Sequence, residues 1–237
     1  KVASRGSANP RVIVYGECRV GGTITQMQTR GTDNSILCLF VVLSGHPINK
    51  ILRVRFNDTL LTVSGDITND ATKTVTNTAF TNTDNANNFG SGRLNRFVGF
   101  DGSQTAKCTL AQSSLTTNFC PDTHLFTDCA YVYIEMVYDA EKLNSLPQMS
   151  FDVQGKKVFD PRTSATAFSS NPALCIRDYL LDTSHGLNAD ATEINDTNFQ
   201  AIANICDEDV SLTSGTEDRF TLNGSFITSS SPKTIME

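Results

Sequence analysis

Tryptophan is absent from this 237-residue chain, histidine occurs three times, and no apolar run is long. The longest run, residues 36–43, falls far short of the roughly 20 residues that a membrane-spanning helix requires. The first ten residues, KVASRGSANP, lack the apolar core of a signal peptide. Acidic residues outnumber basic ones and give a net charge of −6. Such a chain does not attract a polyanion, so nucleic acid is not expected to be its main ligand.

The residue patterns of catalytic and metal sites are also missing. His46, His124 and His185 are scattered, and none lies at metal-ligand spacing from a cysteine or another histidine. Each lies beside Gly, Pro or Thr in an expected turn, where a solvated or backbone-capping role is the simplest interpretation. Gly90-Ser91-Gly92 lacks the rest of a dinucleotide loop, and Gly155-Lys156-Lys157 lacks the leading glycine of a phosphate loop. The sequence therefore predicts no catalytic, cofactor-binding or metal-binding residue, and no enzyme.

Two groups of acidic residues are the strongest remaining candidates for chemistry. Glu135 and Asp139 bracket the end of a strong strand and Glu141 follows, so a glycosidase-like carboxylate pair is one interpretation. A solvated strand end is the other, because acidic residues are common there. Asp207-Glu208-Asp209 follow an expected helix, at its unfavourable negative end. That position indicates a charged helix end with a partner or a cation nearby.

The seven cysteines form no C-x-x-C pair. An odd count, mostly within apolar runs, indicates buried reduced thiols and assembly in a cytosol. The spacing of Cys108, Cys120 and Cys129 permits one disulfide as an alternative.

Alternating and continuous apolar patterns predict a mainly antiparallel β structure. Residues 36–43 form a continuous apolar run, as in a strand buried on both faces. Residues 131–138 form the strongest strand, with Val132, Ile134 and Met136 on one face. Residues 51–56 alternate, and place Arg53 and Arg55 on the face opposite the apolar side chains. Further strands are expected at 12–15, 19–27, 97–100, 107–110, 149–153 and 157–159.

The C-terminal part has helical patterns. Asn171-Pro172 places a good N-cap before a proline at the first helical position. A second helix is expected from Thr197, where Thr197 and Gln200 fit a capping box. Asn223-Gly224, between two short strand-like stretches, predicts a tight hairpin.

These patterns predict an α+β protein that is predominantly β. We expect β-rich domain structure over residues 1–165 and a small two-helix α+β domain over residues 166–237. A polar excursion rich in Asn and Thr, residues 66–91, has only Phe80 and Phe89 as large apolar anchors. The chain begins without Met and ends without a clear terminating element, as expected for a piece of a longer polypeptide.

Several blocks of the sequence, taken in order, resemble the central hub or tip attachment proteins of long non-contractile phage tails. This family is typified by the host-specificity protein J of lambda-like phages. The blocks are VIVYG (12–16) with RVGG (19–22), LSGH (43–46) with FND (56–58), AYVY (130–133), GKKVFDPR (155–162), NPAL through RDYL (171–180), and ANICDE (203–208). Each block is weak alone, but the ordered set spans most of the chain.

The resemblance implies β-rich hub domains with an appended α+β domain in a structural, non-enzymatic virion protein of a siphovirus. Its members form a homotrimer that closes the distal tail tube, matches sixfold to threefold symmetry, and gates genome ejection. The implied partners are the distal tail and tail tube proteins, the tape measure protein, and tail fibres or receptor-binding proteins. Genomic DNA would pass through the channel without specific binding, and the host surface would be contacted indirectly. The implied location is the distal end of the tail, after assembly in the host cytoplasm.

Residues 66–91 depart from the family picture, and two other functions stay open. The first is a carbohydrate-binding host-adhesion module that uses this excursion as its binding loop. The second is an enzyme degrading cell wall or capsule through Glu135 and Asp139. The sequence does not indicate the host, its receptor, or the surface that lines the channel.

Overall fold

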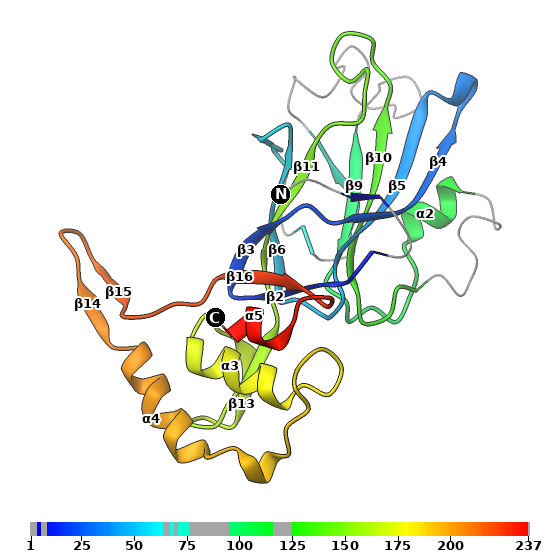
Figure 1. The fold of residues 1–237 in the computed structure, drawn as a ribbon. Helices are drawn as coiled ribbons and strands as arrows, with labels where there is room; N and C mark the ends of the chain where they lie inside the picture. The colour runs from blue at the N-terminus through cyan, green and yellow to red at the C-terminus, as the bar shows by residue number, and fades with distance from the viewer. Residues whose placement is uncertain are drawn as a thin grey trace. The chain divides into compact units, whose positions relative to one another are not determined.

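The structure is a computed structural model that describes residues 4–5, 9–63, 67–68, 71–75, 95–115 and 125–236 (Figure 1). It confirms the α+β class with predominantly antiparallel β-sheet. Two compact units are present: unit 1 comprises Lys1–Asn9 and Arg19–Val153, and unit 2 comprises Pro10–Cys18 and Gln154–Glu237. Most of the polar excursion at 66–91, with Phe80 and Phe89, lies outside the described residues, as do Gly90-Ser91-Gly92, Cys120 and His124.

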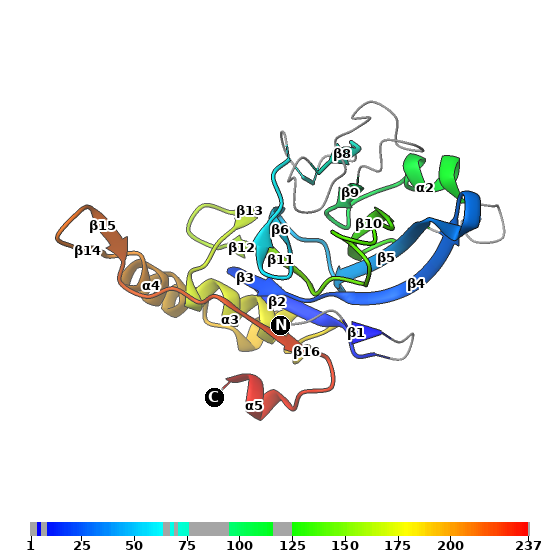
Figure 2. The same cartoon turned by 90° about the horizontal axis from the view of Figure 1, so that it is seen from above.

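A six-stranded sheet forms the body of unit 1. Its order is β1 (Ser4–Arg5), β4 (Thr23–Arg30), β5 (Ile36–Ser44), β10 (Ala130–Val137), β9 (Arg96–Phe100) and β8 (Lys73–Thr74). Figure 2 shows β4, β5, β10 and β9 side by side. Every residue of β10 is buried, so this strand is covered on both faces. The strands expected at 36–43 and 131–138 are confirmed, because continuous apolar sequence suits the middle of a covered sheet.

Aromatic side chains and a short helix pack on one face of this sheet. Tyr131 stacks on Phe100 with ring centroids 4.4 Å apart, and Phe40 packs against Tyr133 at 4.9 Å. Helix α2 (Thr109–Ser114) adds Leu110 and Ala111 to the same core. The expectation of a strand at 107–110 is wrong. Leu110 and Ala111 are neighbours and both are buried. A helical turn lying on the sheet allows this, whereas neighbouring side chains in a strand point to opposite faces.

The second sheet of unit 1 has the order β3 (Glu17–Val20), β11 (Met149–Gln154), β6 (Lys50–Phe56) and β7 (Thr59–Leu60). The chain passes between the two units within β3 and again at the end of β11. Alternation is clear in β6, where Val54 and Phe56 are buried and Arg53 is exposed. The predicted separation of arginines from apolar side chains is therefore confirmed.

Unit 2 is built on two helices and short strand pairs. Strands β12 (Lys157–Asp160) and β13 (Ala165–Phe168) form a hairpin, and β2 (Val12–Tyr15) pairs with β16 (Gly224–Ile227). Helix α3 (Pro172–Leu181) and helix α4 (Asp196–Cys206) pack together around Leu174, Cys175 and Ala203. The remaining elements are β14 (Asp209–Ser211), β15 (Thr216–Asp218), α5 (Pro232–Met236) and two single turns, η1 (Thr32–Asn34) in unit 1 and η2 (Ala191–Glu193).

The helix starts agree with the sequence in one case and differ in the other. The Asn171 side chain accepts hydrogen bonds from the N–H groups of Ala173 and Leu174, which confirms the predicted N-cap of α3. Helix α4 begins at Asp196 with Asn195 as its cap, so the box expected at Thr197 is wrong. A capping box exists instead at η2, between Asp190 and Glu193.

The hairpin expected at Asn223-Gly224 is also wrong. Strand β16 pairs with β2, more than 200 residues earlier in the sequence, and not with the stretch just before it. The observed C-terminal hairpin joins β14 to β15. The Asn223 side chain accepts a hydrogen bond from the N–H of Glu17 at 2.7 Å, so this residue joins a long-range contact and not a tight local turn.

The expected domain division after residue 165 differs from the boundaries of the compact units. The β12–β13 hairpin belongs to unit 2, and residues 10–18 join that unit through the pairing of β2 with β16. Independent folding of these parts stays a prediction. No helix within the described ranges is long and apolar enough to cross a membrane.

Candidate functional site

The turn Asp160-Pro161-Arg162 is closed by its own side chains. The N–H of Arg162 donates to Asp160 Oδ1 at 2.8 Å, and its guanidinium donates to both carboxylate oxygens. These hydrogen bonds lower the pKa of Asp160 and raise that of Arg162. A bidentate pair of this kind fixes direction as well as distance. The turn therefore has a defined geometry before anything else contacts it.

The same arginine ties this turn to the end of α4, and Asp207 in turn connects it to the cap of α3. Arg162 Nη1 lies 2.8 Å from Asp207 Oδ2, just beyond the end of α4. Asn171, the cap of α3, donates to Asp207 Oδ1 at 2.7 Å. Gln200 on α4 donates to the Pro161 carbonyl at 3.0 Å. The cation that the sequence indicated near Asp207 is thus Arg162 of the same chain.

A second charge cluster holds the other end of the joint, by which we mean the segment from Gly155 to Leu181. Lys156 Nζ binds Asp178 Oδ2 at 2.6 Å and also binds Asp182, while the Tyr15 hydroxyl donates to Asp178 at 2.5 Å. Gly155-Lys156-Lys157 therefore has a structural role in unit 2, since Lys156 is occupied by two carboxylates of α3 and its C-cap. Burial raises the pKa of Asp182, but hydrogen bonds from Lys156, His185 N–H and Ser184 N–H outweigh it and lower the pKa to about 2.

Unit 2 is expected to lose stability in acid through this cluster. A carboxyl whose folded pKa lies below its unfolded value of about 3.9 stabilises the fold above that pH, and the contribution disappears as pH falls toward 2. In the Asp182→Asn variant this contribution is absent, so its stability should fall less between pH 5 and pH 2. Urea unfolding followed by circular dichroism across this range checks the slope. Equal slopes for both proteins would contradict the assignment.

The outer face of the four-stranded sheet carries the arginine patch, formed by Arg19, Arg53 and Arg55 around Asp152. Arg19 Nε and Arg55 Nη1 each lie 2.8 Å from the Asp152 carboxylate, and Arg53 Nη1 lies at 3.4 Å. The side chains of Arg19 and Arg53 are 43% and 52% exposed, whereas that of Asp152 is 9% exposed. Arg19 also lies 3.9 Å from the exposed Asp58 carboxylate. Three cations therefore face two carboxylates, and the patch carries an excess positive charge in an acidic protein.

The arm is the segment from Ile202 to Phe220, which contains the end of α4 and the β14–β15 hairpin. Figure 1 shows the hairpin extending beyond the end of α4. Every residue of β14 and β15 is exposed. Five large apolar side chains of the arm are between 38% and 54% exposed: Ile202, Ile205, Val210, Leu212 and Phe220. Apolar side chains gathered in this way are typical of a surface that meets another molecule.

The structure places Glu135 where no substrate reaches. Its side chain is 0% exposed, and it accepts hydrogen bonds from Arg30 at 3.1 Å, Arg96 at 2.5 Å and the Tyr133 hydroxyl at 3.1 Å. Asp139 closes a turn by accepting the N–H groups of the next acidic residue, Glu141, and of Lys142. The two carboxylates have separate structural tasks, which gives the glycosidase interpretation no support.

His46 contacts a backbone carbonyl, and His185 makes a contact through its own backbone N–H. His46 is buried, and its Nδ1 lies 2.7 Å from the Pro47 carbonyl oxygen, so of the two expected roles it has the backbone-capping one. The His185 N–H donates to Asp182. Among the residues described, no group of three or more His, Cys, Asp or Glu is arranged to hold a metal ion. Cys38, Cys175 and Cys206 are buried free thiols, and a disulfide among Cys108, Cys120 and Cys129 stays a prediction.

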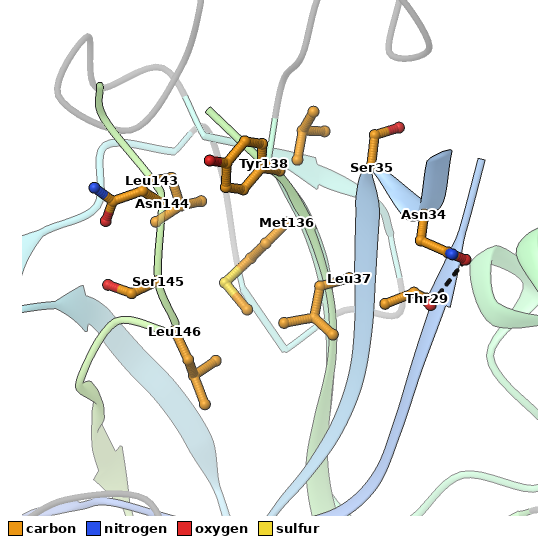
Figure 3. Close-up of a pocket in the computed structure, with 11 residues that line it drawn as sticks. Thr29, Asn34, Ser35, Leu37, Met136, Tyr138, Leu143, Asn144, Ser145 and Leu146 are labelled. Carbon is orange, nitrogen blue, oxygen red and sulfur yellow. Dashed lines mark hydrogen bonds between the residues drawn. The ribbon is translucent and has the colours of Figure 1, made fainter. Parts of the chain in front are cut away.

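An open pocket of about 260 Å³ lies at the end of β10 (Figure 3). Leu37, Met136 and Leu146 form part of its wall, and Tyr138 with Asn144 lies along its edge. The lining is apolar, amide and hydroxyl, without a charged side chain. Such a surface offers packing and hydrogen bonds but no acid–base chemistry.

The arginine patch was not identified from the sequence. Alternation in residues 51–56 separated Arg53 and Arg55 from the core, but nothing local indicated that β11 would bring Asp152 beside them. The exposed arm was missed because its apolar residues have the spacing of an ordinary buried helix face.

Comparisons with known proteins identify no family. No protein-family model matches the sequence, and no curated protein sequence matches it significantly. Among solved structures, the chain is similar to one described as the virion of a native gene transfer agent particle, with 18% identity and a TM-score of 0.44. The similarity covers 65% of this chain and 28% of that one.

Proposed function

We propose that this chain is a structural, non-enzymatic part of a phage tail tip, within a homotrimeric central hub that closes the distal tail tube. In this role it anchors fibres or receptor-binding proteins and rearranges when the receptor is engaged, so that the genome is released. The proposal rests on the ordered sequence blocks that resemble the tip attachment family.

One observation carries the proposal furthest: three of those blocks meet in unit 2. Lys156, from the first, binds Asp178 of the second. Arg162, also from the first, binds Asn204 and Asp207 of the third. The residues that carry the resemblance are therefore those that fix α3, α4 and the β12–β13 hairpin together. A hub must keep its geometry when force acts on the tail, and the paired charges of the joint serve this purpose. A catalytic site would instead leave its charged groups accessible to a substrate.

The charge balance agrees with a conduit for DNA. A net charge of −6 disfavours capture of phosphate, so a genome could pass without adhering. We expect the arginine patch to face away from the channel. A reconstruction of the assembled tip with a strongly basic lumen would contradict this part of the proposal.

The assembled state gives the decisive test. We expect mass measurement of the full-length protein purified with its neighbours to show three copies together with distal tail proteins. Negative-stain imaging of the same sample should place it at the tail end. A monomer without tail partners would overturn the proposal.

A carbohydrate-binding host-adhesion module is the second candidate, favoured by the pocket at the end of β10. Tyr138, 54% exposed, borders it beside Asn144 and Ser145, an aromatic–amide combination suited to a sugar ring. A glycan array separates the two functions, because a scaffold shows no saturable binding. Binding that is lost in Tyr138→Ala would favour the adhesion module.

A further inference from the structure

The hairpin of the arm carries acidic charge that its own unit does not neutralise. In the β14–β15 register Asp209 lies directly opposite Asp218, and Glu217 is the next residue along β15. Like charges in directly opposed positions destabilise a strand pair. By contrast, the acids nearest the helix are paired: Asp207 with Arg162, and Glu208 with Arg219 at 2.6 Å. Within the described parts of the chain, no cation lies within ion-pair distance of Asp209, Glu217 or Asp218.

A metal ion does not explain this arrangement. The described residues contain no group of three or more His, Cys, Asp or Glu that could hold one. The acidic face is also flat and exposed on both strands, so it lacks the several converging oxygen ligands that hard cations require. The charge pattern therefore points to a cationic protein surface.

The other face of the hairpin exposes apolar side chains to solvent. Val210 and Leu212 alternate with Asp209 and Ser211, so they lie on the side opposite the acidic pair. Ile205 and Phe220 extend the exposed apolar surface toward α4. An isolated two-stranded hairpin is marginally stable in water, and an exposed apolar one gains stability when a partner covers it.

The arginine patch has the complementary composition. Arg19, Arg53 and Arg55 present three positive charges against the carboxylates of Asp152 and, at 3.9 Å from Arg19, Asp58. Leu60 is paired with Arg55 across β6 and β7 and is 46% exposed. Cations beside an exposed apolar side chain match an arm that offers the acidic pair Asp209 and Asp218, with Ile205 and Phe220 exposed nearer to α4.

We infer that the arm of one copy docks on the arginine patch of a second copy. Asp209 and Asp218 lie against Arg19 and Arg53, and Ile205 and Phe220, nearer to α4, cover Leu60. The contact joins two different surfaces, so each copy both gives an arm and receives one, and the assembly closes as a ring when the rotation permits. The inference rests on the proposed function for the number of copies, but its two surfaces are tested separately.

The test uses two charge reversals and two matched controls in the full chain. Asp218→Lys alters the arm and Arg53→Glu alters the patch. Glu141→Lys and Lys157→Glu make the same charge changes at exposed positions outside both surfaces. Sedimentation velocity over a concentration series gives the association constant. We expect each reversal to lower it by about tenfold to a hundredfold, as for ion pairs at protein interfaces, and the controls to leave it within about threefold.

Mixing the two altered proteins identifies the contact. The Asp218→Lys copy keeps an intact patch and the Arg53→Glu copy keeps an intact arm, and the two reversed charges attract each other, so both contacts between unlike copies can form. We expect the mixture to associate although each altered protein alone does not, and we expect weaker association of the wild type in high salt. The Asp218→Lys chain should melt no lower than the wild type, because the substitution removes the opposed pair. Loss of assembly thus cannot come from misfolding.

The possible outcomes separate this inference from the proposed function. Wild-type oligomers that all four variants leave intact would overturn the arm-to-patch contact while the hub proposal stands. A wild type that stays monomeric at every concentration, with each reversal without effect, would overturn both. Altered proteins that fail to combine when mixed would show that the two surfaces do not meet between copies.

Discussion

Glu135→Gln is expected to lower the free energy of unfolding by about 3–5 kcal/mol, the range found when one partner of a buried ion pair is removed. The Glu135 carboxylate has no exposed surface and binds Arg30, Arg96 and the Tyr133 hydroxyl. Glutamine keeps the shape but removes the charge. Two guanidinium groups, each about a quarter exposed, would then remain against the sheet without a full anionic partner.

Urea unfolding followed by circular dichroism measures this loss, and hydrogen exchange in peptides from β10 and β5 assigns it to unit 1. The matched control is Glu141→Gln, which changes the same side chain at an exposed position and should alter stability by less than about 0.5 kcal/mol. A loss for Glu135→Gln no larger than the control's would mean that the arginines are satisfied elsewhere.

Gly155→Ala is expected to disrupt unit 2, at a cost of about 3 kcal/mol or more, since overpacking against rigid backbone exceeds the usual range. A Cβ at Gly155 would lie 2.2 Å from the Val14 carbonyl oxygen and 2.6 Å from its carbon. Around this contact the Gly155 N–H donates to the Gly16 carbonyl, and the Lys156 N–H donates to the Val14 carbonyl. Adding one methyl group therefore separates β2 from the start of the joint.

Gly224→Ala provides the control, because a Cβ there has no atom within 4 Å. Alanine at that strand position should be neutral or slightly stabilising, since it restricts the unfolded chain. Thermal unfolding of both variants, with hydrogen exchange in α3 and α4 as the unit-specific measurement, tests the comparison. Equal melting temperatures would show that the backbone at Gly155 shifts without cost.

The sequence predicted the elements whose pattern is set by their own residues. Strands β5 and β10 are continuous apolar runs, and such runs are stable only where both faces are covered. The start of α3 follows from Asn171 and Pro172, because a cap is a contact between near neighbours in the sequence. Each of these conclusions depended only on residues that are close together in the sequence.

The failures have a common physical cause, which is that a distant partner decided the outcome. A good local hairpin signal, Asn223-Gly224, stands at the start of β16. The strand pairs with β2 instead, and its partly buried Phe226 packs against Tyr179 with ring centroids 5.5 Å apart. The arginine patch depends on β11 lying between β3 and β6. Glu135 looked like a candidate acid because its sequence neighbours do not reveal Arg30 and Arg96, which are brought to it by strands on either side.

The pairing of β2 with β16 has a consequence for how the protein is made. The partner strand of residues 12–15, residues 224–227, is synthesised about 200 residues after them. At about 5–20 residues per second, the first strand waits at least ten seconds with one edge unpaired. Closing so long a loop is slow, and an open strand edge invites pairing with other chains. Nascent copies held close together on one messenger would thus be exposed to exchange of β2 between chains.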